Sequence, residues 1–107
     1  MEELRKEIFN MVEDILVFDP AFKERMLVKI INLSAEKLGQ LKGMLVELID
    51  WQEEVTVRLI NQNPTLYNQI LNEKMQFEKE AVSLYKEKMA AEDHNKMQVI
   101  LHKIQSL

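Results

Sequence analysis

The sequence predicts an all-α fold, a small antiparallel bundle of four to five helices built on a long central hairpin, and three observations support this. The chain contains only two glycines and two prolines, and residues that favour helices dominate the remainder. Apolar residues recur every three or four positions, which is the spacing of one helix face. At two places a good N-cap residue stands directly before a proline, which is a typical helix start.

Length and composition set the size of the fold. The chain has 107 residues, of which 47% are hydrophobic and 30% are charged. These values are typical of a globular domain, and the chain is too short to divide into two parts that each bury a core. We therefore interpret residues 1–107 as a single helical domain.

The first two helices are predicted over about residues 2–18 and 20–33. The Asp19-Pro20 pair separates them, because Asp19 can cap the second helix and proline fits its first position. The first helix carries its apolar residues in one stripe: Leu4, Ile8, Met11, Val12, Ile15 and Phe18.

The third and fourth helices form the predicted hairpin. The third spans about residues 35–62 with Ser34 as its N-cap, and the fourth spans about residues 64–91 after the Asn63-Pro64 pair. Each would be roughly 40 Å long at 1.5 Å per residue. The short connection between them predicts that they run antiparallel.

A short fifth helix follows from the rotational phase of the apolar residues. At about 100° per residue, Ile70 and Ala81 share one side of the fourth helix, whereas Met97 and Ile104 would fall on the opposite side of its continuation. A break near residues 92–95 removes this conflict. We predict that Asp93 caps a fifth helix over about residues 94–106.

The third helix has a regular core face with one polar member. This face comprises Leu41, Leu45, Leu48, Gln52, Val55 and Leu59. Gln52 either lies at the edge of the bundle or forms a hydrogen bond across a helix interface. Trp51 lies about 80° from the centre of this face. Trp51 is therefore predicted at the boundary of the core. Either another helix of the chain or a helix of a partner covers this boundary.

The opposite side of the third helix is unusual for a surface. It carries Gly39, Gly43, Val46 and Val57, although glycine costs up to about 1 kcal/mol inside a helix. Either another helix approaches closely here, or the glycines are tolerated at the surface. Trp51, Tyr67 and Tyr85 could form an amphipathic rim around a contact. The candidate interface residues are Gly39, Gly43, Val46, Trp51, Val57, Tyr67 and Tyr85.

Several kinds of chemistry find no support in the sequence. The chain has no cysteine, so thiolate chemistry and cysteine-ligated metals are excluded. His94 and His102 are about 12 Å apart along a helix, and neither has the preceding glutamate of a di-metal bundle. We therefore expect no enzyme activity, no cofactor and no metal. No concentrated basic face indicates nucleic-acid binding.

We expect a small soluble, cytoplasmic protein-interaction module that self-associates as a homodimer or another homo-oligomer. The start MEELRKE does not resemble a signal peptide. The first alternative is a peripheral membrane or lipid-binding protein, in which Lys23, Arg25 and Lys29 flank an apolar face. The second alternative is a bundle that binds a ligand in its interior.

Overall fold

The all-α prediction is confirmed. The computed structural model describes residues 2–107, except for the side chains of Glu73, Met75 and Gln76. It contains no strand in that range and forms six helices rather than the predicted four to five. They are α1 Glu2–Asp14, α2 Pro20–Asn32, α3 Ala35–Gln62, α4 Pro64–Gln76, α5 Glu78–Glu87 and α6 Ala91–Gln105.

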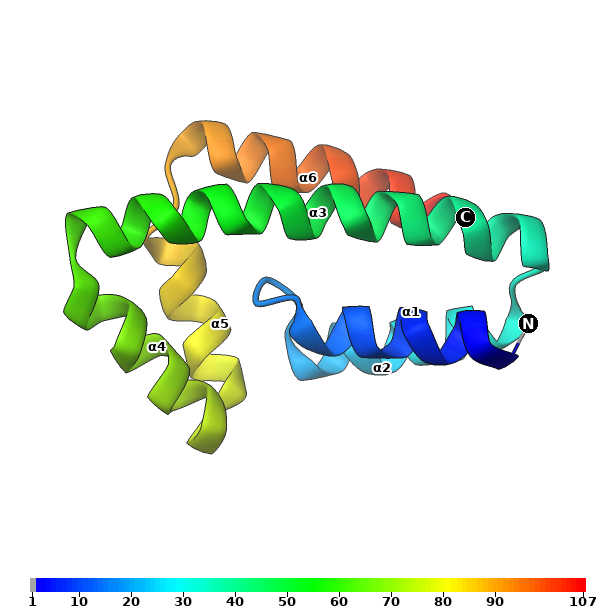
Figure 1. The fold of residues 1–107 in the computed structure, drawn as a ribbon, viewed down its shortest axis with the longest axis horizontal. Coiled ribbons are helices and arrows are strands. Elements are labelled where there is room, and N and C mark those ends of the chain that lie inside the picture. The colour runs from blue at the N-terminus through cyan, green and yellow to red at the C-terminus, as the bar shows by residue number, and fades with distance from the viewer. Residues whose placement is uncertain (1) are drawn as a thin grey trace.

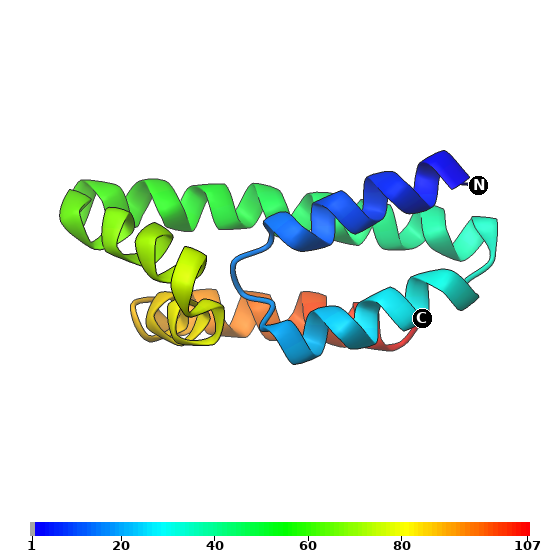
Figure 2. The ribbon, with the colours of Figure 1, turned by 90° about the horizontal axis from the view of Figure 1, so that it is seen from below.

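The longest helix, α3, with 28 residues, is central to the arrangement. α6 runs back along α3 in the opposite direction, and α1 and α2 lie along the same axis (Figure 1). α1 and α3 lie along one edge of the molecule, and α2 and α6 lie along the other (Figure 2). α4 and α5 cross the far end of α3 as a short pair that leads into α6.

The three predicted helix starts are confirmed by their capping hydrogen bonds. The carboxylate of Asp19 accepts the Phe22 N–H at 2.8 Å and the Ser34 hydroxyl accepts the Lys37 N–H at 3.3 Å. The Asn63 side chain accepts a backbone N–H, that of Leu66, at 3.3 Å. Each cap satisfies a backbone donor that the first turn leaves without a helical partner.

The prediction of one helix over residues 64–91 is wrong, and with it the long hairpin of two equal helices. The chain turns at Phe77, and α5 folds back so that Tyr85 reaches α3. α6, not the predicted fourth helix, is the antiparallel neighbour that runs along α3. Neither glycine nor proline occurs after Pro64, so no helix-breaking residue marks this turn in the sequence.

The predicted break at residues 92–95 lies several residues too late. α6 begins at Ala91, and Asp93 lies inside its first turn rather than at its N-cap. The Asp93 carboxylate accepts the Ala90 N–H at 3.0 Å. The carboxylate therefore stabilises the start of α6 from the N3 position, as the acidic residue of a capping box does.

The first helix also ends earlier than predicted, at Asp14 instead of residue 18. Residues 15–18 leave the helix but remain buried. Gln52 explains this end, because its side chain donates to the Asp14 carbonyl at 3.3 Å and accepts the Leu16 N–H at 2.7 Å. The Gln52 side chain of α3 thus replaces backbone hydrogen bonds that would otherwise continue α1.

The predicted core face of α3 is confirmed. Every member is buried, and Leu41, Leu45 and Leu48 have no exposed surface. Gln52, the polar member, forms hydrogen bonds across the α1–α3 interface, so the second of its two alternatives is correct. The core between α1, α2, α3 and α6 continues into α5 through Tyr85.

Candidate functional site

The side of α3 that faces away from the core is uncovered. We define the outer face of α3 as Gly39, Gly43, Val46 and Val57. Val46 is 43% exposed and Val57 is 57% exposed. A Cβ atom added to either glycine would meet no atom within 4 Å. Among the described residues, therefore, no other helix makes the close approach that the glycines would permit.

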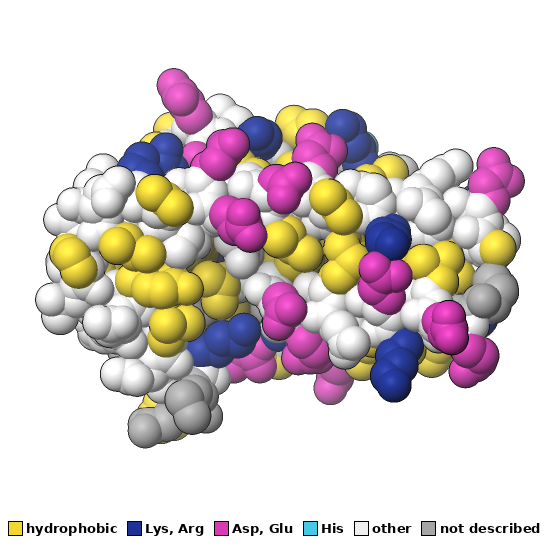
Figure 3. All heavy atoms as spheres, viewed as in Figure 1, with side chains coloured by type: hydrophobic (Ala, Val, Ile, Leu, Met, Phe, Trp, Pro, Cys, Tyr) yellow, Lys and Arg dark blue, Asp and Glu magenta, His cyan; other side chains and the backbone are white. Residues whose placement is uncertain are grey.

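The surface around the outer face mixes apolar and acidic side chains. In the view of Figure 3, apolar groups on the α3 side of the molecule alternate with carboxylates. Glu47, Asp50, Glu53 and Glu54 lie within two turns of α3, and all four are exposed. None of them forms an ion pair with another residue in the described part of the chain. The surface is therefore apolar with a negative charge.

Alanine at Gly39 or Gly43 should stabilise the folded chain. Each replacement removes glycine's entropic cost without a clash, so we expect the free energy of unfolding to rise by about 0.5–1 kcal/mol per site. Urea unfolding at low protein concentration measures this. Gln40→Ala, at an exposed neighbouring position, is the control and should change stability by less than about 0.5 kcal/mol. Destabilisation at either glycine would contradict the open surroundings.

A groove of about 270 Å³ adjoins the outer face at Val57. We call it the α3–α4 groove, and its lining residues are Leu16, Gln52, Glu53, Thr56, Val57 and Tyr67. The structure thus brings together two of the predicted interface residues, Val57 and Tyr67, which are ten positions apart. The turn after α1 closes the groove through Leu16, which sequence reasoning missed because that turn was predicted as helix.

Polar bonds fix the wall of the α3–α4 groove. The Tyr85 hydroxyl donates to the Gln52 carbonyl at 3.2 Å and lies 3.0 Å from the Thr56 hydroxyl. Burial raises the pKa of Tyr85 from 10.0 to about 12, and the hydrogen bond to Thr56 opposes this rise. α5 is therefore attached to α3 by a neutral phenol at ordinary pH.

Two of the predicted interface residues lie in the interior instead of at a rim. Trp51 is 3% exposed and Tyr85 has no exposed surface. Other helices of the same chain cover them, so neither side chain is open to a partner in this fold. The Trp51 Nε1–H is buried and has no hydrogen-bond partner in the part of the chain that the structure describes. Its angle from the core face indicated a boundary, but not which neighbour covers that boundary.

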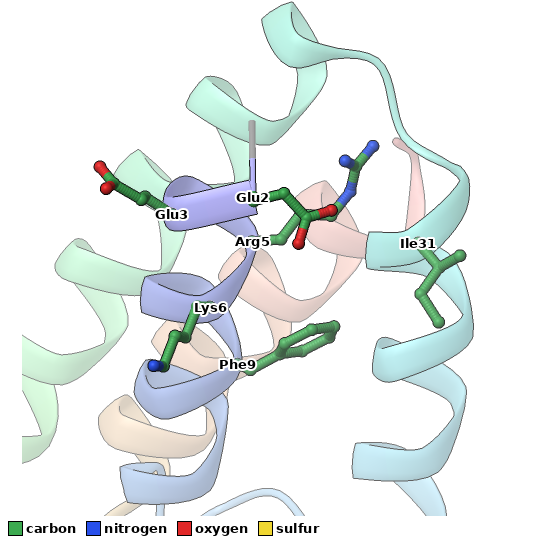
Figure 4. Close-up of a pocket in the computed structure, with 6 residues that line it drawn as sticks. All are labelled: Glu2, Glu3, Arg5, Lys6, Phe9 and Ile31. Carbon is green, nitrogen blue, oxygen red and sulfur yellow. The ribbon is translucent and has the colours of Figure 1, made fainter.

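A second hollow, of about 620 Å³, lies between the start of α1 and the end of α2 (Figure 4). Its apolar residues, Phe9 and Ile31, lie on opposite sides of it. Arg5 donates to the Ile30 and Leu33 carbonyls at 3.4 and 3.3 Å, and so caps the end of α2. Glu2, Glu3 and Lys6 also line the hollow, so its rim carries both signs of charge and indicates no particular ligand.

Two interhelical ion pairs were not anticipated from the sequence. Lys23 is 5% exposed, and its ammonium group lies 2.5 Å from Glu78 of α5 and 3.5 Å from Glu13 of α1. Arg58 of α3 pairs with Asp93 of α6. The Lys23–Glu78 and Arg58–Asp93 pairs join residues 55 and 35 positions apart, which no local pattern would reveal.

No three His, Cys, Asp or Glu side chains that the structure describes gather closely enough to hold a metal ion. No helix in the described part of the chain combines the length and apolarity of a membrane span. Comparison with known protein families, curated proteins and solved structures finds no match to this chain.

Proposed function

We propose that this protein is a small protein-interaction module that self-associates through the outer face of α3, without a catalytic role. The observation that supports this most directly is the open surface at Gly39 and Gly43, with Val46 and Val57 exposed beside them. Glycine in a helix interior weakens the helix. No other described residue packs closely against either glycine to offset that cost. A second helix seated on the outer face would gain close backbone approach and cover both valines.

The α3–α4 groove gives this contact a defined end. Val57 joins the outer face to the groove, and Tyr67 on α4 forms its other side. An apolar side chain from a partner would find apolar walls here, together with polar groups held in place by the Tyr85 bonds. Grooves that accept an apolar side chain beside an exposed apolar surface anchor many protein interfaces.

Charge on the outer face predicts the salt dependence of self-association. Contact between two copies brings the exposed carboxylates of Asp50 and its neighbours close to the same groups of the second copy. Salt shortens the distance over which such charges act, from about 10 Å at 0.1 M to about 3 Å at 1 M. Self-association through this face should therefore strengthen as salt is added.

Val57→Glu should weaken self-association at least about tenfold while leaving the helical content unchanged. The new carboxylate would be buried in the contact without a partner, and a tenfold loss needs only about 1.4 kcal/mol of the cost of that burial. Sedimentation equilibrium over a range of concentrations measures the association, and circular dichroism measures the helix.

Val99→Glu is the matched control for this substitution. Val99 on α6 is 56% exposed, compared with 57% for Val57, and lies outside both the outer face and the α3–α4 groove. It should leave association unchanged. Gly43→Glu should act like Val57→Glu. Wild-type protein that remained monomeric at every concentration would contradict the proposal. Equal effects of Val57→Glu and Val99→Glu would show that the contact does not lie on the outer face of α3.

The membrane alternative has less support than the sequence indicated. It relied on three basic residues of α2, but Lys23 is buried and paired with Glu78. Arg25 stacks over the Phe22 ring, with its guanidinium carbon 5.5 Å from the ring centroid. Lys29 donates to the Gln105 carbonyl at 3.1 Å. The cationic surface of α2 is therefore smaller than an interfacial helix requires.

A further inference from the structure

The turn between α4 and α5 has no local cause in the sequence. Phe77 is the N-cap residue of α5, and its apolar side chain provides no capping hydrogen bond. Proline occurs only at positions 20 and 64, and glycine only at positions 39 and 43. Phe77 is also 60% exposed, so the turn leaves a large apolar side chain in water. These features are unfavourable for a turn and acceptable in a helix.

The buried residues on either side of the turn suit one continuous helix equally well. Ile70 of α4 has no exposed surface, and neither has Tyr85 of α5; Ala81 is 2% exposed. At 100° per residue, a straight helix would place Ala81 about 20° and Tyr85 about 60° from Ile70. The three side chains would therefore remain on one side of the helix, and Phe77 would join that side.

The contacts between the two sides of the turn are compatible with exchange between chains. Residues 78–107 are attached to the preceding part of the chain by Glu78 with Lys23, Tyr85 with Thr56, and Asp93 with Arg58. Each bond needs one residue from each side of Phe77. The same bonds can form when residues 78–107 come from a second copy, because only the turn itself would change.

We propose that two copies of this chain exchange residues 78–107, with α4 and α5 of each copy joined through Phe77 into one continuous helix. In the dimer, α5 and α6 of each copy pack against α1, α2, α3 and α4 of the other, because the extensive contact between α4 and α5 also crosses the turn. The exchange gains the helical hydrogen bonds that the turn interrupts. It is a mode of self-association additional to contact through the outer face of α3, and does not require that contact.

Two substitutions of the exposed Phe77 shift the exchange in opposite directions. Phe77→Asp provides a capping side chain for α5, which should favour the turn by about fivefold. The exchanged dimer loses two such turns, so dimerisation should weaken by about 25-fold. Phe77→Leu keeps an apolar side chain at this position and has a higher helix propensity than phenylalanine, so it should strengthen dimerisation by about two- to threefold. Sedimentation after refolding at high concentration measures both, and circular dichroism checks that both variants fold.

Zero-length carbodiimide cross-linking identifies which chain provides residues 78–107. Unlabelled and ¹⁵N-labelled protein are unfolded, mixed, refolded and cross-linked, and the dimer is isolated. The Lys23–Glu78 pair crosses the turn, whereas the Lys42–Glu7 pair, 2.9 Å apart, lies entirely before it. For the Lys23–Glu78 pair, we expect cross-linked peptides in which one peptide is labelled and the other is not. For the Lys42–Glu7 pair, we expect both cross-linked peptides to come from the same chain.

The results separate this inference from the contact through the outer face of α3. A dimer whose Lys23–Glu78 cross-links stay within one chain, or that is unaffected by Phe77→Asp, overturns the exchange. If exchange is overturned in this way but the dimer is lost in Val57→Glu, the contact through the outer face of α3 is still supported. A dimer with mixed Lys23–Glu78 cross-links that tolerates Val57→Glu supports exchange and rejects the α3 contact. Absence of any dimer overturns both.

Discussion

Replacing Gln52 with leucine should lower the free energy of unfolding by about 2–4 kcal/mol. The Gln52 side chain accepts the Leu16 N–H at 2.7 Å and donates to the Asp14 carbonyl at 3.3 Å. Leucine fits the apolar core in volume but can form neither bond. A buried backbone N–H left without a partner costs about 1–3 kcal/mol, and the second lost bond adds about 1 kcal/mol.

Urea unfolding of the wild type and the variant tests this expectation. Glu53→Leu is the control, because Glu53 is an exposed neighbour on α3 and such positions usually change stability by less than about 0.5 kcal/mol. A neutral Gln52→Leu would mean that the turn after α1 satisfies its backbone groups without α3. Hydrogen exchange at Leu16 gives a second measurement, since its amide should lose protection selectively in the variant.

The features that depend on neighbouring residues were predictable from the sequence. Asp19, Ser34 and Asn63 could be identified as caps because a cap acts within one turn of its own helix. The core face of α3 could be identified because a helix repeats every 3.6 residues, whatever packs against it. The same periodicity placed Val46 and Val57 on the side of α3 away from the core, and both are exposed.

The features that depend on distant residues were not predictable in the same way. Within a single copy of the chain, the bonds of α5 to α2 and α3, such as those of Glu78 and Tyr85, require the turn at Phe77. The end of α1 at Asp14 follows from Gln52, 38 positions away. In both places the local pattern permits a longer helix. The local sequence therefore describes what each segment can form, and packing selects among the possibilities.

The candidate interface shows the same limit. Helical angles correctly separated the outer face of α3 from its core face, but they left Trp51 and Tyr85 at a boundary. The structure buries both side chains. Tyr85 is buried because α5 folds back onto α3, where its hydroxyl lies 3.0 Å from that of Thr56. A single helix over residues 64–91 would have removed that cover, so the error at this turn transferred Tyr85 to the predicted surface.

Tyr85 should make the folded protein sensitive to alkaline pH. Its pKa is raised by burial to about 12 in the folded chain, whereas an unfolded chain releases the phenolic proton near pH 10. Between these values the folded state binds more protons than the unfolded state, so stability falls as pH rises. Tyr85's contribution is fully present below pH 10 and is lost as pH rises through 12. The slope reaches about 1.4 kcal/mol per pH unit, and the total loss is about 2–3 kcal/mol.

Tyr85→Phe separates this effect from the titration of the lysines. Phenylalanine keeps the ring in the core but has no ionisable group, so its stability should fall less steeply than that of the wild type above pH 10. The variant should be less stable at pH 7 by about 1 kcal/mol, because the bonds to Gln52 and Thr56 are lost. Urea unfolding at several pH values measures the difference, and Tyr67→Phe, at a half-buried position, is the control. Identical alkaline slopes for the wild type and Tyr85→Phe would show that the phenol ionises equally in the folded and unfolded chains, which its burial beneath α3 should prevent.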